Sequence, residues 1–152
     1  MIFLNIIWPV FAMVAITFAV WFTLFVQRTA HMKVNPPAAT DFEHGEAARR
    51  YFQPVEMPAN NLANLFEMPV LFFALAPLLI VTQQATAVQI VLAWLFVALR
   101  AAHSFIHIGP KKVPARFMAY LASCVVLLAM WIGFGIDMVA AAARYSAEIA
   151  QP

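Results

Sequence analysis

Four long stretches of apolar residues are separated along the chain by shorter polar segments. The first stretch, residues 2–26, contains no charged residue, and the other three cover residues 62–81, 85–108 and 114–136. About 20 apolar residues are enough for a helix to cross the hydrocarbon core of a bilayer. A helix also pairs its own backbone groups, which an open sheet in lipid does not. The pattern therefore predicts an all-α integral membrane protein, a bundle of four transmembrane helices.

The three connections between these stretches differ in length and charge. The first, residues 27–61, is long and polar, the second is an uncharged turn at residues 82–84, and the third, residues 109–113, is short and basic. Prolines interrupt the first connection, so we expect an irregular segment with one short helix near residues 43–52. Its length leaves two interpretations open, a lid over a site and a solvated tether. Because the chain has no internal repeat, residues 1–152 are predicted to form a single membrane domain.

Composition and charge support the membrane assignment and predict an orientation. The chain is 64% hydrophobic and 11% charged, with a mean hydropathy of +0.83, which is too apolar for a soluble domain of this size. Lys and Arg gather in the first and third connections, so the positive-inside rule predicts that both face the cytoplasm and that both termini lie on the opposite side. In a bacterium this would be the inner, or plasma, membrane. The net charge of +2 gives no reason to expect a nucleic-acid partner.

Polar and ionisable side chains lie within or directly before the last three apolar stretches, near their cytoplasmic ends. In sequence order they are Asn60, Asn64, Glu67, Arg100, His103, His107, Arg116 and Tyr120. Their spacings of three, four and seven residues place each group on one face of its helix. Ionisable groups within a membrane span are costly, and most of them are paired or functional. We therefore expect three polar stripes that point toward one another inside the bundle.

These residues have structural as well as functional interpretations. Glu67 and Arg100 lie at similar depth in their spans, which predicts a buried ion pair that locks helix packing. Arg116 lies about one turn inside the fourth span, where its guanidinium is either a headgroup anchor or a binding group for an anion. A lone His103 fits a core histidine and a lone Tyr120 an interfacial aromatic residue, but their register with Arg116 favours a shared site.

Two motifs resemble the MAPEG family, the membrane-associated proteins of eicosanoid and glutathione metabolism. Residues 64–72, NLFEMPVLF, resemble the second-helix signature of that family. A second motif, which resembles the third-to-fourth helix region without a gap, consists of Arg100, His103, His107, Pro114, Arg116 and Tyr120. Its spacing is similar to that of the prostaglandin E synthase branch, in which a tyrosine takes the place of His107. The chain thus resembles a bacterial-type member of the family.

The resemblance implies a left-handed four-helix bundle that forms a homotrimer and holds glutathione between neighbouring subunits near the cytoplasmic face. The implied function is a glutathione-dependent transferase or peroxidase that acts on hydrophobic electrophiles or lipid hydroperoxides. By position, Arg116 corresponds to the arginine that activates the thiol, and a fixed cation favours the reactive thiolate. Tyr120 is the implied second catalytic residue, and Arg100 corresponds to the partner of the glutamate. The implied cofactor-binding residues are Asn64, Glu67, His103 and His107.

The chain departs from the family pattern in two places. Family enzymes carry arginines in the turn before the asparagine of the second span, where they hold the glutathione carboxylates, but this chain has none there. Candidates for the missing charge are Arg28, at the cytoplasmic end of the first span, and Arg49 and Arg50, and we include Arg28 among the cofactor-binding residues. Phe117 replaces the serine that follows the arginine of the fourth span in the prostaglandin branch, which argues against that isomerase reaction.

Two other classes of function stay open. The missing arginines favour a non-catalytic lipid-binding or partner-binding membrane protein, and glutathione binding would discriminate this class from an enzyme. A metal site formed by His103, His107 and Glu67 is the less favoured alternative, because Glu67 is expected to pair with Arg100. We predict no metal. The expected partners are further copies of the chain, membrane lipid and a hydrophobic small molecule.

Overall fold

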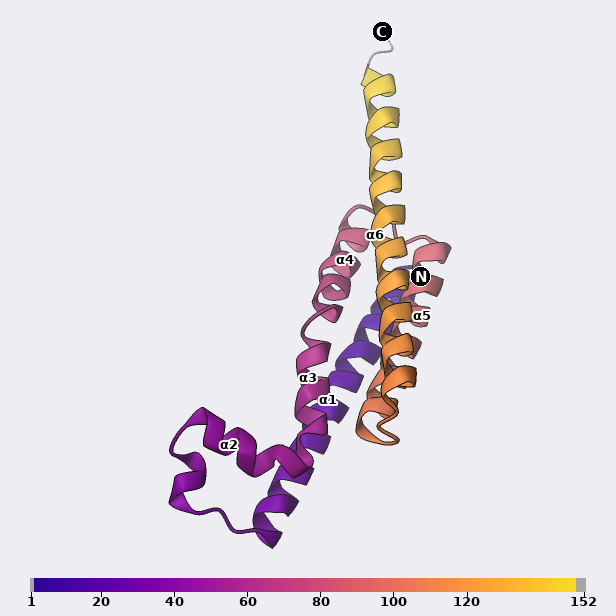
Figure 1. Cartoon of the computed structure of the whole chain (residues 1–152). Helices are drawn as coiled ribbons and strands as arrows, with labels where there is room; N and C mark the ends of the chain where they lie inside the picture. The colour runs from indigo at the N-terminus through magenta and orange to yellow at the C-terminus, as the bar shows by residue number, and fades with distance from the viewer. Residues whose placement is uncertain (1, 150–152) are drawn as a thin grey trace.

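The protein is a bundle of helices in the computed structural model, which describes residues 2–149 and has no strand within that range (Figure 1). Four apolar segments are long enough to cross a membrane, namely Ile6–Val34, Met57–Val81, Ala87–Ile108 and Val113–Ala147. They belong to α1 (Ile2–Val34), α3 (Met57–Leu65) with α4 (Pro69–Val81), α5 (Ala87–Ile108) and α6 (Val113–Ile149). The prediction of an all-α membrane bundle is confirmed.

The helix α5 is the central element, because it packs against α6, α1 and α3. It begins at a polar cap, where the Thr86 hydroxyl accepts a hydrogen bond from the Gln89 amide at 3.3 Å. The side chain of Gln89 is also buried, and its Nε2 donates to the Met130 carbonyl at 3.0 Å, which ties α5 to α6. In the middle of the bundle, Phe96 stacks on Phe72 of α4 with ring centroids 5.0 Å apart. Side chains on α5 can therefore meet residues of both α3 and α6.

The second membrane segment is not the continuous helix that the apolar stretch at 62–81 predicts. α3 ends at Leu65 and α4 begins at Pro69, with a non-helical step between them. Proline has no N–H to donate and its ring clashes with the preceding turn, so the helical hydrogen-bond pattern is interrupted before Pro69. Glu67 lies in this step, outside both helices, and the last carbonyl groups of α3 become available to other donors.

The helix α6 is much longer than the predicted span at 114–136. It has 37 residues, and at about 1.5 Å per residue it is roughly 55 Å long, compared with about 30 Å for the hydrocarbon core of a bilayer. Figure 1 shows its C-terminal part projecting beyond the other helices. Asp137 and Arg144 lie in the C-terminal half of α6, so this half contains charged side chains where the predicted span at 114–136 has ended.

The first connection contains η1 (Ala39–Phe42), α2 (Gly45–Phe52) and η2 (Gln53–Val55). An aromatic cluster holds it on the end of α1, with the Tyr51 ring 4.9 Å from His31 and 5.5 Å from Phe42 between centroids. The Tyr51 hydroxyl donates to the Asn35 carbonyl, and burial, followed by the nearby carboxylate of Asp41, raises the pKa of this phenol. Figure 1 shows α2 beside the end of α1 and away from α6. In this chain the connection therefore packs on α1 and does not cover α5 and α6.

Candidate functional site

Polar side chains of α3, α5 and α6 gather inside the bundle. The stripe on α5 consists of Arg100, His103, Ser104 and His107, all of which are buried. Their spacing of three and four residues keeps them on the face of α5 that meets α3 and α6. This part of the sequence prediction agrees with the structure, since α5 turns its ionisable side chains inward.

Arg100 is fully buried, with 0% of its surface exposed. Its Nη2 donates to the carbonyl of Asn64 at 2.7 Å, and this acceptor is one of the carbonyl groups that the end of α3 leaves free. The guanidinium carbon lies 5.5 Å from the centroid of the Tyr120 ring, within the range of a cation–π interaction. Within residues 2–149, Nε and Nη1 have no hydrogen-bond partner. The buried guanidinium thus has two donors that the described residues do not satisfy.

The predicted ion pair between Glu67 and Arg100 does not form in the structure. Glu67 is exposed, and the ion pair found in the described part of the chain joins Arg50 and Glu46, at 3.6 Å. The prediction assumed a continuous helix that would carry Asn64 and Glu67 on one face. Because the chain leaves the helix after Leu65, Glu67 lies outside α3, and the hydrogen bond of Arg100 to this segment goes to the backbone carbonyl of Asn64.

His103 has one ring nitrogen engaged and one free. Its Nδ1 lies 3.0 Å from the Arg116 carbonyl oxygen. A carbonyl can only accept, so Nδ1 carries the proton, and in the neutral ring Nε2 holds the lone pair. Nε2 is buried and has no partner among residues 2–149. The first turn of α6 therefore fixes the tautomer of His103 and leaves a proton acceptor inside the bundle.

His107 and Tyr120 flank this histidine. The ring centroid of His103 is 5.5 Å from that of His107, with the planes perpendicular, and 5.7 Å from that of Tyr120. Arg116 and Tyr120 are both half-buried and lie one turn apart on α6. In the described part of the chain no three side chains of His, Cys, Asp or Glu are arranged to hold a metal ion, and Glu67 does not join the histidine pair.

Arg28, the remaining predicted residue, lies elsewhere. Its guanidinium carbon is 4.6 Å from the centroid of the Phe52 ring, and the side chain lines a separate cavity along α1. Arg49 and Arg50 of α2 are exposed. Within the described residues of a single chain, none of these three arginines makes a hydrogen bond or ring contact with the polar residues of α5 and α6, Arg100, His103, His107, Arg116 and Tyr120.

Sequence reasoning missed Asn61 and Ser104. Asn61 is fully buried, and its Oδ1 accepts a hydrogen bond from the Ser104 hydroxyl at 3.3 Å, while its Nδ2 has no partner in residues 2–149. The sequence interpretation had placed Asn60 on the inner face, but Asn60 is exposed. The sequence did contain a signal for both residues. Asn61 lies three residues before Asn64, and Ser104 lies four residues after Arg100, so each shares a helix face with a residue of the predicted site.

Fold and site together define a polytopic helical membrane protein with a buried, donor-rich polar site at one end of the bundle. The family model of the MAPEG family matches residues 6–136, which is most of the chain. The chain belongs to the MAPEG family, whose members are generally associated with glutathione and with transferase, peroxidase and related functions in membranes. No curated protein and no solved structure matches the chain.

Proposed function

We propose that the chain is a membrane enzyme that activates glutathione at the α5–α6 site for transfer to hydrophobic electrophiles or for reduction of lipid hydroperoxides. One observation carries the proposal: the site has a surplus of buried, unpaired donors, led by Nε and Nη1 of Arg100. A buried charge without a counterion is costly, and an anionic ligand removes that cost. The carboxylates and the thiolate of glutathione are anions of the required kind.

The unpaired groups suggest how the ligand is held. Arg100 and Nδ2 of Asn61 are suited to a carboxylate, because both offer donors that the described residues leave unused. The exposed Glu67 carboxylate and the nearby Asn64 remain available for the ammonium and amide groups of the ligand. Arg28 is not needed for this arrangement, since it lies against Phe52.

Arg116, Tyr120 and His103 supply the chemistry in this proposal. A bound glutathione supplies a thiol, whose ordinary pKa of about 8.5 leaves little thiolate at neutral pH. The positive charge of Arg116 and the hydroxyl of Tyr120 stabilise the thiolate. The lone pair of His103 Nε2 accepts the thiol proton, because its other nitrogen already donates to the Arg116 carbonyl. The ring of His107 packs edge-on against the imidazole of His103, with centroids 5.5 Å apart.

Titration calorimetry of the detergent-purified protein with reduced glutathione tests the proposal. The wild type should bind, Arg116→Ala should bind more weakly and lose conjugation, and Arg100→Met should lose binding. Arg144→Met is the matched control, because it removes an exposed cation from the projecting end of α6. If the wild type does not bind glutathione, the enzymatic proposal is wrong.

A second candidate is a non-catalytic lipid-binding or partner-binding protein, favoured by the lack of arginine in the turn before Asn64. In that case the folded protein would show no heat of binding with glutathione.

The assembly and orientation are also proposals. A homotrimer is supported by the exposed Glu67, which a neighbouring subunit would shield from lipid. A common side for both termini is supported by Figure 1, in which the start of α1 and the end of α6 lie toward one end of the bundle and the first connection and the α5–α6 turn toward the other. Native mass spectrometry tests the trimer, and reporter fusions at each terminus test the prediction that both lie outside the cytoplasm.

A further inference from the structure

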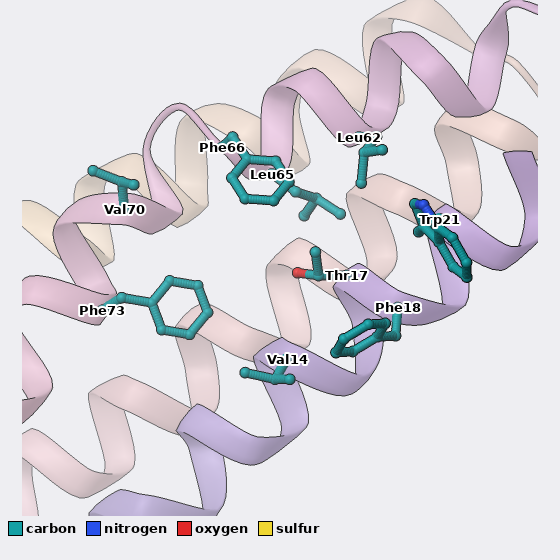
Figure 2. Close-up of a pocket in the computed structure, with 9 residues that line it drawn as sticks. All are labelled: Val14, Thr17, Phe18, Trp21, Leu62, Leu65, Phe66, Val70 and Phe73. Atoms are coloured by element: carbon teal, nitrogen blue, oxygen red, sulfur yellow. The ribbon is translucent and has the colours of Figure 1, made fainter.

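An apolar groove runs between α1 and the α3–α4 segment, on a face of the bundle that the polar site does not use. It has a volume of about 360 Å³, and its walls include Val14 and Phe18 of α1 and Val70 and Phe73 of α4. Figure 2 shows the rings of Phe18 and Phe73 on opposite sides of the gap. Thr17 also lines the groove, but its hydroxyl donates a hydrogen bond to the Met13 carbonyl at 3.0 Å. The groove therefore presents apolar surface along its length.

A second cavity continues the groove along α1. It has a volume of about 260 Å³, shares Trp21 with the first, and is bounded by Arg28 and by Phe52 of α2. Val14, Trp21 and Arg28 are each seven residues apart and thus lie on one face of α1. From Val14 to Arg28 the helix rises about 21 Å, and one leaflet of a bilayer, headgroup region included, is about 20–22 Å thick. The two cavities together have the length of one leaflet, with the cation at one end.

Arg28 is held in position at that end. Its guanidinium stacks on Phe52 at 4.6 Å, and its Nε is buried without a partner in the described residues. Lys33, further along the same helix end, is exposed. A guanidinium with a free donor matches the geometry of a phosphate, and anionic lipids collect at basic juxtamembrane segments.

We propose that the groove and the second cavity together bind one anionic phospholipid of the leaflet next to the basic connections. Its acyl chain would lie in the groove between Val14 and Phe73, and its phosphate at Arg28. The charge of Arg28 favours an anionic lipid over a neutral one, and the apolar lining favours a lipid over a free phosphate. The site uses no residue that the proposed glutathione site requires. It also gives Arg28 a ligand other than glutathione.

Native mass spectrometry of delipidated protein in detergent tests the headgroup assignment. Phosphatidylglycerol and phosphatidylcholine with the same acyl chains are added at equal concentration, without glutathione. The wild type should retain phosphatidylglycerol in preference to phosphatidylcholine. Arg28→Gln should weaken this retention at least about tenfold, because a charged hydrogen bond to phosphate is lost. Lys33→Gln, which removes the same charge from an exposed position, should retain the lipid like the wild type.

A second pair of variants tests the groove. Val14→Phe fills the groove and should reduce retention of phosphatidylglycerol, while Val91→Phe adds the same volume to an exposed position on α5 and should not. Circular dichroism of each variant verifies folding, and Val70→Phe serves as the second groove variant. Equal retention of the two phospholipids, unchanged retention in Arg28→Gln, or displacement of phosphatidylglycerol by equimolar oleate would overturn the proposal.

Discussion

Replacing Arg100 with methionine tests whether this arginine binds a ligand or only stabilises the fold. Methionine keeps much of the length of the side chain but removes the buried charge and its donor to the Asn64 carbonyl. Loss of that charged hydrogen bond destabilises the fold by about 1.5–3 kcal/mol. Removal of a buried charge whose other donors are unpaired relieves a desolvation cost of several kcal/mol per ion. Without ligand, the variant should therefore be about as stable as the wild type, or more stable.

Glutathione should reverse this order of stability, so that the wild type becomes more stable than Arg100→Met. At a ligand concentration of about 100 times Kd, binding stabilises the wild type by about 2.7 kcal/mol. For a chain of this size about 1 kcal/mol corresponds to 2–4 °C in Tm, so the wild type should gain roughly 5–11 °C. Arg100→Met should gain almost nothing, because its main anion-binding group is absent.

Thermal unfolding in detergent, followed by circular dichroism with and without reduced glutathione, measures both effects. Arg144→Met is carried through the same scans as the control for loss of a cation. If the unfolding free energy of ligand-free Arg100→Met fell by about 3–5 kcal/mol, the reasoning would be contradicted. A fall of that size is the cost of breaking a buried ion pair, in which Arg100 would already have a counterion. Glu67 of the same or a neighbouring subunit would then be the partner of Arg100, as the depth of the two residues in their spans predicts.

Two further predictions concern residues on α5 and α6. His103→Asn keeps a donor for the Arg116 carbonyl but removes the proton acceptor, so the conjugation rate should fall by about 10²–10⁴ while calorimetry shows little change in glutathione affinity. Gly135→Ala should raise the unfolding free energy by up to about 1 kcal/mol, because a Cβ there meets nothing within 4 Å. Gly133→Ala should lose most of that gain, because its Cβ would lie 3.2 Å from Nε2 of Gln89; equal melting temperatures of the two variants would contradict this.

Much of the polar site could be predicted because its residues lie at helical spacing on one element. Arg100, His103 and His107 are three, four and seven residues apart, and one buried face of α5 contains them all. The partner of Arg100 could not be predicted in the same way. It depends on which turn of α3 faces α5, and the break before Pro69 changes that turn, so that Asn64 contacts Arg100 and Glu67 does not. Pro69 was visible in the sequence and was the signal for this break.

The sequence by itself determined that the chain has four helical segments able to cross a membrane and that it turns the polar face of α5 inward. Both follow from local properties, the length of an apolar run and the period of a helix, which need no knowledge of distant residues. The tertiary structure alone decided that Asn61 faces Ser104, that His103 donates to the Arg116 carbonyl, and that the first connection packs on α1. These contacts join residues that are far apart in the chain, and their geometry depends on how neighbouring helices end and pack.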